Sequence, residues 1–230
     1  MDPLQGRPRV GITYGPTRAW IDPVRYIANA STGKLGASLA DRFASVGARV
    51  EAIVGPHAAR PRSSGVALHP IESPAQLQER LELFSNTHLA DPFRLWIHAM
   101  AVLDFVPEAT SKEKIPSDEK GLQLKLVPTP KIIDSFQTLF PDCSLVGFKL
   151  LSGADLGKLK EAAEELGQRA RCDLVVANFE PFRDPAGHEA HFWDRKKNDW
   201  FGPRKGKPEI AEEILRWFAA ILRDDVPAQA

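Results

Sequence analysis

The sequence predicts one α/β domain over residues 1–230, built on a three-layer, Rossmann-like, doubly wound and mostly parallel sheet. Three observations support this fold class. Strand-like runs alternate with helical patterns, which is typical of parallel sheets with helices on both faces. The first strand leads through a glycine-rich loop into a helix, as in the first β-α turn of such sheets. The composition, 43% hydrophobic and 26% charged over 230 residues, is that of an ordinary soluble globular domain.

The elements are predicted in the following order. The first strand, residues 9–14, is rich in β-branched side chains, and the first helix covers residues 33–46. Apolar runs predict further strands at 49–54, 66–70, 94–100, 144–149 and 174–177. Helical patterns predict helices at 74–84, 130–139, 156–171 and 208–222, the last with Ile210, Ile214, Trp217 and Ile221 on one face.

Two further features interrupt this alternation. A two-stranded excursion, a β-hairpin outside the main sheet that is expected to serve in dimerisation, is expected around residues 122–127. The Arg- and Pro-rich stretch 57–65 and the polar region 182–207 are expected to be mobile loops.

The charge balance and the cysteine count exclude several classes of protein. Lysine and arginine together number 30, as do aspartate and glutamate, so nothing favours nucleic acid or an anionic membrane as a main partner. Cys143 and Cys172 cannot make a disulfide framework, which favours a reducing compartment. The sequence has no signal-peptide core and no apolar run of about 18 residues, so the cytoplasm is the expected location.

Residues 12–36 carry the most informative functional pattern. After the first strand, a loop dense in Gly, Pro, Asn, Ser and Thr leads into a helix at Ser31-Thr32-Gly33-Lys34-Leu35-Gly36. A helix N-terminus presents unpaired N–H groups and partial positive charge, and glycines let a phosphate approach the backbone. The pattern predicts an anion-binding cradle, with an ordinary β-α connection without ligand as the alternative. Neither Gly-x-Gly-x-x-Gly nor Gly-x-x-x-x-Gly-Lys-Ser/Thr is present.

Other candidate residues are interpreted as structural. His188-Glu189-x-His191 lacks the His-Glu-x-x-His spacing of zinc helices, and the alternation that follows it favours a surface hairpin over a metal site. Cys143 and Cys172 are expected to serve in packing. His98, at the end of an apolar strand, is expected to be a core histidine whose hydrogen bonds are satisfied.

The segment 12–36 resembles the signature of phosphopantothenate–cysteine ligase, also called phosphopantothenoylcysteine synthetase. That signature reads Ile-Thr-Ser-Gly-Gly-Thr-x-x-x-Ile-Asp-x-Val-Arg-x-Ile-Ser-Asn-x-Ser-Ser-Gly-x-x-Gly. So many fixed positions in one window make the resemblance specific. The matching residues here are Thr13, Gly15, Thr17, Ile21, Asp22, Val24, Arg25, Ile27, Asn29, Ser31, Gly33 and Gly36.

Later segments extend the resemblance in the family's order, to about Trp193. Residues 98–107 are similar to the family's Ala-Ala-Val-x-Asp-Phe/Tyr-x-Pro, and residues 112–117 to its flexible flap with a Lys-Ile pair. Residues 125–132 resemble its Thr-Pro-Lys-Ile turn. Residues 146–151 and 173–178 resemble its Gly-Phe and Val-Ala-Asn segments. By composition alone, the same stretches are equally a turn cap, a charged solvated loop, core and a strand-end turn.

The resemblance implies a ligase that joins 4′-phosphopantothenate to L-cysteine in coenzyme A biosynthesis. The substrate carboxylate attacks the α-phosphate of a nucleotide triphosphate, pyrophosphate leaves, and the cysteine amine then attacks the acyl-nucleotide. Mg²⁺ shields the phosphates. CTP is the expected co-substrate, with ATP as the alternative.

The resemblance also implies partners. The family is a homodimer with shared sites, and most bacterial members are fused behind a flavin-dependent decarboxylase. The sequence leaves no room for that domain before Val10. The stand-alone bacterial type is therefore expected, without flavin, and association with a separate decarboxylase stays open.

Roles for single residues follow from the same resemblance. Asn29 and Lys114 are expected to act in catalysis, Lys114 at the phosphates and Asn29 at the acyl-nucleotide step. The expected nucleotide contacts are Gly15, Ser31, Gly33, Gly36, Lys114, Phe148 and Asn178. The expected phosphopantothenate contacts are Asn29, Met100, Ala101 and Asp104, with Arg25 reaching the substrate's phosphate from the neighbouring subunit. No metal ligand is predicted.

Departures from the family pattern keep two other classes open. Pro16 removes a backbone N–H from the cradle, Glu165 brings negative charge near Arg169 and Arg171, and Phe179 replaces a frequent aspartate. The first alternative is a relative that binds nucleotide or phosphopantothenate without turnover. The second is a nicotinamide-dependent oxidoreductase, which the missing Gly-x-Gly-x-x-Gly and the lack of an acidic residue ending the second strand disfavour.

Overall fold

The structure is a computed structural model, which describes residues 4, 6–87, 89–116, 121–152, 155–179 and 188–224. Its helices are α1 (Lys34–Ser45), α2 (Pro74–Thr87), the 3₁₀ turn η1 (Ile132–Ser135), α3 (Phe136–Leu139), α4 (Leu156–Arg169) and α5 (Gly206–Asp224). Its strands are β1 (Arg9–Pro16), β2 (Arg18–Trp20), β3 (Tyr26–Ala28), β4 (Arg49–Val54), β5 (Val66–Pro70), β6 (Phe93–Ala101), β7 (Phe105–Pro107), β8 (Leu126–Pro128), β9 (Ser144–Leu151), β10 (Leu174–Phe179), β11 (Glu189–Asp194) and β12 (Asp199–Lys205). None of the described helices combines the length and apolar character needed to cross a membrane.

An eight-stranded sheet with the order β12-β11-β10-β9-β6-β1-β4-β5 forms the centre of the molecule. In the order of the sheet, each strand from β10 through β9, β6, β1 and β4 to β5 is parallel to its neighbour. By contrast, β11 is antiparallel to β10, and β12 is antiparallel to β11. From β1 the chain moves outward through β4 and β5, and from β6 it moves the other way through β9 and β10. The strand order therefore reverses between β1 and β6, and sheets of this class bind ligands beyond the strand ends at such a point.

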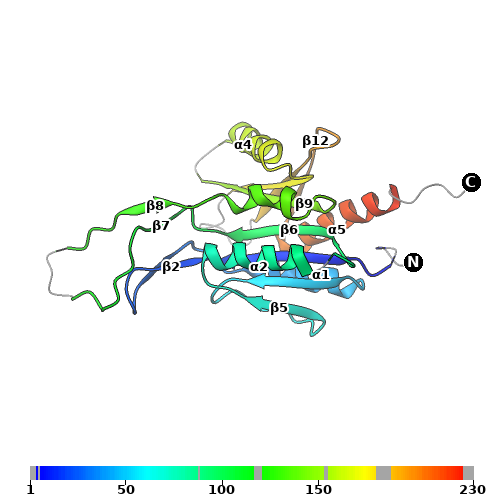
Figure 1. Cartoon of the computed structure of the whole chain (residues 1–230). Coiled ribbons are helices and arrows are strands. Elements are labelled where there is room, and N and C mark those ends of the chain that lie inside the picture. Colours follow the sequence, from blue (N-terminus) through cyan, green and yellow to red (C-terminus); the bar gives the residue numbers. More distant parts are fainter. Residues whose placement is uncertain are drawn as a thin grey trace, which may run out of the picture.

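Helices cover both faces of the sheet, which confirms the predicted three-layer, doubly wound fold (Figure 1). On one face α1 packs against α5, and the ring centroids of Phe43 and Phe218 lie 6.3 Å apart. On the other face α2, α3 and α4 surround the fully buried Trp96. A hydrophobic core lies on each face of the sheet. Side chains of the central strands contribute to both cores because successive residues of a strand point to opposite faces.

Most predicted elements are confirmed. The strands β4 and β5 coincide with the predicted runs 49–54 and 66–70. The predicted helix at 130–139 is split between η1 and α3. Cys143 and Cys172 are free and buried in one core, as expected. His98 is the expected satisfied core histidine, since its Nδ1 lies 2.6 Å from the Thr13 hydroxyl.

The prediction of a mobile loop over 182–207 is wrong for residues 189–205, which form β11 and β12. Residues 182–187 lie outside the described part of the chain. The predicted hairpin is confirmed, but it is not a surface feature, because Phe192 and Trp193 are buried as β11 extends the main sheet. The polar residues Glu189 and His191 alternate with apolar residues in β11, so the sequence did not indicate a strand of the main sheet.

The prediction of a long loop between the first strand and the first helix is also wrong in part. β2 and β3 pair as a hairpin in which the rings of Trp20 and Tyr26 meet edge to face at 5.3 Å. The turn is held by Asp22, whose Oδ1 accepts the backbone N–H groups of Val24 and Arg25 at 2.9 and 2.7 Å. The sequence signal for this turn is Asp22 followed by proline.

A second hairpin, β7 with β8, confirms the excursion predicted near residues 122–127. It contacts β2, and the two hairpins project together beyond the carboxyl ends of the central strands (Figure 1). We call the hairpin of β2 and β3 with its turn (residues 18–28), together with the described residues 105–116 and 121–128 that include β7 and β8, the arm. The eight-stranded sheet and its helices are called the body.

Candidate functional site

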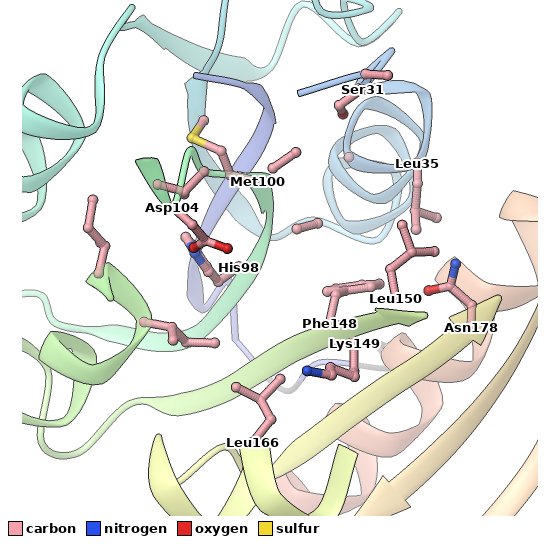
Figure 2. A pocket seen from close by; sticks show the side chains of 18 of the residues that line it. Ser31, Leu35, His98, Met100, Asp104, Phe148, Lys149, Leu150, Leu166 and Asn178 are labelled. Carbon is pink, nitrogen blue, oxygen red and sulfur yellow. The ribbon is translucent and has the colours of Figure 1, made fainter. Parts of the chain in front are cut away.

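A cavity of about 700 Å³ lies at the carboxyl ends of β6, β9 and β10 and at the N-terminus of α1 (Figure 2). It is next to the point where the strand order reverses. The cavity brings together many of the residues predicted from the sequence. Those that line it are Ser31, Gly33, Gly36, Met100, Ala101, Asp104, Phe148 and Asn178.

The N-terminus of α1 forms one wall of the cavity. Gly33, its N-cap residue, has φ 66°, a left-handed conformation that favours glycine, and no side chain caps the helix. A Cβ at Gly36 would lie 2.2 Å from the Cβ of Tyr14, so glycine is required for α1 to lie this close to β1. Uncapped N–H groups next to the ammonium group of Lys34 suit an anionic ligand.

The end of β6 forms the second wall. The Asp104 carboxylate accepts a hydrogen bond from Lys131 Nζ at 2.6 Å, and both side chains are about half exposed. The amide of Asn29 donates to the backbone oxygens of Ala101 and Val102 at 3.3 and 2.9 Å. Asn29 therefore lies at the rim and holds the loop before α1 against the end of β6.

His98 contributes a neutral group to the same wall. Burial lowers its pKa to about 4, so the imidazole is uncharged near neutral pH. Its position beside Met100 and Asp104 is visible in Figure 2.

The ends of β9 and β10 form the third wall. Val176 is opposite Phe148 and Asn178 is opposite Leu150, so the alternation of strands places Phe148, Leu150 and Asn178 on one face of the sheet. Figure 2 shows Leu150 and Asn178 at one end of the cavity, Met100 and Asp104 at the other, and Phe148 between them. An aromatic ring next to a carboxamide can bind the face and the edge of a planar polar ligand.

Cations surround the cavity. Among the lining residues these are Lys34, Lys131, Lys149, Arg169 and Lys207. Lys131 is paired with Asp104, and Arg169 donates to Asp134 at 2.6 Å. The remaining three make no ion pair with any described residue. The lining of the cavity is therefore electropositive, which suits the binding of phosphate groups.

Sequence reasoning found only part of this cationic set. It named Arg169 and Arg171, and Arg171 does not line the cavity. It quoted Lys34 and Lys149 without giving them a role, although each is next to a predicted contact. Lys207 could not be found from the sequence, because only the pairing of β12 with β11 brings the start of α5 to the cavity.

Four predicted residues do not line the cavity of this chain: Asn29, which lies at its rim, and Gly15, Arg25 and Lys114. Gly15 has φ 85°, and a Cβ there would lie 2.6 Å from the Cβ of Ala58, so its glycine serves a close contact between loops. Arg25 lies on the arm and donates to Asp22 Oδ2 at 2.7 Å and to the Ile115 oxygen at 3.0 Å. Lys114 is on the same arm and is exposed.

Two other features were considered as sites. A cavity of about 870 Å³ lies between α2 and the arm, but none of the predicted site residues lines it. The described residues contain no group of three or more His, Cys, Asp or Glu side chains that could hold a metal ion. His191 Nε2 instead lies 3.4 Å from Glu189 Oε1.

The fold and the cavity define a doubly wound α/β protein with an anion-binding site at the switch point of its sheet. The chain belongs to the family described as the DNA/pantothenate metabolism flavoprotein C-terminal domain, whose model matches residues 4–222.

Curated relatives share this sequence over part of their length. A cysteine/cysteine sulfinic acid decarboxylase from an unidentified prokaryote is 35% identical over 222 residues, which cover 93% of this chain and 58% of that protein. The coenzyme A biosynthesis bifunctional protein CoaBC of Thermococcus kodakarensis is 39% identical over 178 residues, which cover 76% of this chain and 42% of that protein. The chain thus spans about half the length of these relatives.

Solved structures share the fold over nearly the whole chain. The DNA/pantothenate metabolism flavoprotein from Streptococcus pneumoniae has a TM-score of 0.82 and 27% identity, covering 93% of this chain and 99% of that one. The C-terminal domain of a CoaBC protein has a TM-score of 0.78 and 26% identity, covering 98% and 100%. A Cab2 H337A mutant in complex with phosphopantothenate-cysteine has a TM-score of 0.75 at 22% identity, covering 94% and 87%, and is similar in fold alone.

Proposed function

We propose that this chain is a ligase that joins 4′-phosphopantothenate and L-cysteine through an acyl-nucleotide, with CTP as the expected co-substrate. The observation that carries the proposal is one cavity that combines an uncapped helix N-terminus, three lysines without an ion pair to any described residue, and the carboxyl end of β6. Membership of the family, and relatives named for coenzyme A biosynthesis, support the choice of this reaction among those that such a cavity could serve.

The reaction needs a carboxylate to be activated before it can accept an amine. The carboxylate oxygen of phosphopantothenate attacks the α-phosphorus, and the bond from that phosphorus to the bridging oxygen breaks, releasing pyrophosphate. The cysteine nitrogen then attacks the acyl carbon, the nucleoside monophosphate leaves, and the amine loses a proton. Positioning and charge stabilisation supply most of the rate in such phosphoryl chemistry.

The residues of the cavity divide between the two substrates. Ser31, Gly33 and Gly36, with Lys34, are suited to the phosphates, because N–H groups and an ammonium group stabilise negative charge. Phe148 and Asn178 are suited to the base. Met100, Ala101 and Asp104 at the end of β6 are suited to the thin pantothenate chain, because the Asp104 carboxylate can accept hydrogen bonds from its amide and hydroxyl groups. Gly15 supports this arrangement from the loop behind it.

Mg²⁺ is expected to enter with the nucleotide. It typically keeps several waters and is held by phosphates with one or two carboxylates, so it does not require a cluster built by the protein. When bound, it would offset the charge of the phosphates. Flavin is not expected in this domain, although the family's description contains the word flavoprotein.

The arm supports a homodimer with shared sites. Large apolar side chains are exposed on it, and these are Val24 (57%), Tyr26 (42%), Phe105 (54%), Leu122 (47%), Leu124 (39%) and Leu126 (44%). A monomer in water gains nothing from displaying them together, so we propose that a second copy of the chain covers this surface. Arg25 and Lys114 would then act from the arm at a cavity of the dimer.

The test is release of pyrophosphate with phosphopantothenate, Mg²⁺ and each of CTP, ATP, GTP and UTP, with and without cysteine. We expect CTP to support release, and phosphopantothenoylcysteine to form only when cysteine is present. Asn29→Ala and Lys114→Ala should each lower the rate about 10²- to 10³-fold, the typical effect of removing one stabilising group.

The matched control for Lys114 is Lys112→Ala, which removes an exposed lysine from the same loop and should leave the rate within about twofold. A folded protein that releases no pyrophosphate with any nucleotide would refute the ligase and favour a binding protein without turnover.

A further inference from the structure

His188 lies immediately before β11 and lines the cavity next to Asn178 and Lys207. Its backbone oxygen accepts the N–H of Gly206 at 2.7 Å, which ties it to the first residue of α5. Asn178 is opposite Ala190 in the β10–β11 pairing, so His188 is near the Asn178 end of the cavity rather than the Asp104 end. This side chain is not among the residues assigned above to the phosphates, the base or the pantothenate chain.

Both ring nitrogens of His188 are shielded from solvent and have no hydrogen-bond partner among the residues that the structure describes. A few other described side chains have such an atom, including the indole nitrogens of Trp96 and Trp193. Of these residues, only His188 lines the cavity, and only His188 has two such atoms. An unpaired buried polar atom costs about 1–3 kcal/mol, so an unpaired group on a cavity wall points to a ligand that pairs it.

The imidazole is uncharged at neutral pH. Burial lowers the pKa of His188 from its ordinary value, and the positive charge of Lys207 lowers it further. A neutral imidazole has one N–H donor and one acceptor nitrogen. His188 therefore suits a neutral partner with donors and acceptors, and not a phosphate, which needs donors only.

The groups around His188 further restrict the chemical class of ligand that this end of the cavity can bind. Phe148 offers a ring face between the two ends of the cavity, and Leu150, which is 51% exposed, extends that apolar surface (Figure 2). The amide nitrogen of Asn178 donates to the Phe179 oxygen at 3.3 Å, which leaves the carboxamide oxygen to accept from a ligand. A flat aromatic ring with polar atoms along its edge, such as a nucleobase, matches this set.

We propose that His188 hydrogen-bonds the edge of the nucleobase and, with Asn178, selects among bases. The inference rests on the proposed function only in assuming that a nucleotide binds in this cavity. A site built to hydrogen-bond one ligand discriminates against analogues that leave its polar groups unpaired. His188 therefore acts in specificity, and the positive groups near α1 act on the phosphates that all nucleotides share.

The experiment measures equilibrium binding of CTP, UTP, ATP and GTP with Mg²⁺, and of inorganic tripolyphosphate, which has no base. In His188→Ala, affinity for the preferred nucleotide should fall about tenfold, as for a lost hydrogen bond in a buried site, while tripolyphosphate binding stays unchanged. The preference among nucleotides should fall with it. His188→Gln, which keeps a donor and an acceptor, should recover part of the preference and guards against misfolding of the alanine variant.

His191→Ala is the matched control. It removes the same kind of side chain three residues further along, where the ring contacts Glu189 and does not line the cavity, so nucleotide binding should not change. Equal loss of tripolyphosphate and nucleotide affinity in His188→Ala would overturn the inference, as would an unchanged preference.

The outcome separates this inference from the ligase function because binding requires no turnover. A protein that selects nucleotides through His188 but releases no pyrophosphate keeps the inference and loses the ligase. A protein that makes product with the same nucleotide preference in His188→Ala keeps the ligase and loses the inference.

Discussion

The body and the arm use their large apolar side chains in opposite ways. In the body, Tyr14, Trp96 and Trp193 are fully buried between the sheet and its helices. On the arm, Val24, at the turn of the first hairpin, and Phe105, on a strand of the second, are more than half exposed. Since burial of apolar surface is the main favourable term in folding, the body is stabilised by its own contacts, whereas the arm gains little from its own.

This difference in burial indicates that the body and the arm have different roles. The body supplies the cavity and most of the residues that line it, all within one chain. The arm carries Arg25 and Lys114, which do not line that cavity but were expected to act on the substrates. The comparison therefore predicts that changes in the arm affect activity through assembly, and changes in the body affect stability.

The largest effect is expected from the arm's apolar surface. Val24→Asp combined with Phe105→Asp places two charges on side chains that are already exposed, so the single chain should fold as before. The proposed dimer should dissociate, as measured by analytical ultracentrifugation, and the rate of pyrophosphate release should fall at least about 100-fold because groups shared across the dimer lose their position.

Leu83→Asp is the control for this change, since Leu83 is 48% exposed on α2 of the body. It should leave both the association state and the rate unchanged. A wild-type protein that is monomeric and active would contradict the whole distinction between body and arm.

A glycine of the body gives the next largest effect. A Cβ at Gly11 would lie 2.3 Å from the ring of Trp96, which stacks on Phe140 at 4.8 Å and cannot move freely. Gly11→Ala should destabilise the protein by about 1–3 kcal/mol, which lowers the melting temperature by several degrees for a chain of this size.

Gly121→Ala in the arm is the matched substitution, because no atom lies within 4 Å of its added Cβ. Thermal unfolding should distinguish the two variants clearly. Similar melting temperatures would mean that the core relaxes around the new methyl group, and would weaken the view of the body as tightly packed.

The body was also the more predictable region. Its central strands are buried on both faces, so a run such as residues 174–177 is apolar enough to be found without knowledge of its neighbours. β11 was missed as a sheet strand because the polar residues Glu189, His191 and Asp194 interrupt its apolar ones. The hairpin of β2 and β3 was missed because Pro and Gly residues around it indicated a loop.

The site was predictable where it consists of backbone and strand ends, and less so elsewhere. The α1 cradle and the ends of β6, β9 and β10 were found from local patterns and from the family resemblance. His188 and Lys207 were not, because a β-hairpin and the start of α5 bring them to the cavity from a distant part of the chain. Hydrophobic periodicity predicts one helix or strand at a time, so it cannot predict which distant residues come together in a cavity.

The pH dependence of stability should also separate the body from the arm. Burial lowers the pKa of His98 to about 4 from an ordinary 6.5, so the native state resists the proton that the unfolded chain accepts. The neutral His98 therefore makes its full contribution to the free energy of unfolding above pH 6.5, and this contribution is lost as the pH falls toward 4. Between pH 7.5 and 5 the loss should be about 2 kcal/mol, and His98→Gln should lack it in urea unfolding.

The arm responds in a lower range. Desolvation raises the pKa of Asp22, but hydrogen bonds from the backbone of Val24, Ile115 and Arg25, and the charge of Arg25, outweigh it and lower the pKa below 3.8. Stability from this carboxylate is present above pH 3.8 and is lost only below it. If His98→Gln showed the same pH dependence as the wild type, the loss would have to come from another group, with His188 the first to test.

The smallest effect is expected from an ion pair on the arm. Lys125 Nζ lies 2.6 Å from Glu108 Oε1, but these side chains are 74% and 50% exposed. Pairs of this kind contribute between zero and about 1 kcal/mol, because water screens the charges and both long side chains lose conformational freedom. Glu108→Gln should therefore leave the melting temperature and the dimer dissociation constant unchanged within error. If the dimer instead weakened more than tenfold, the polar contacts of the arm, and not only its apolar surface, would determine assembly.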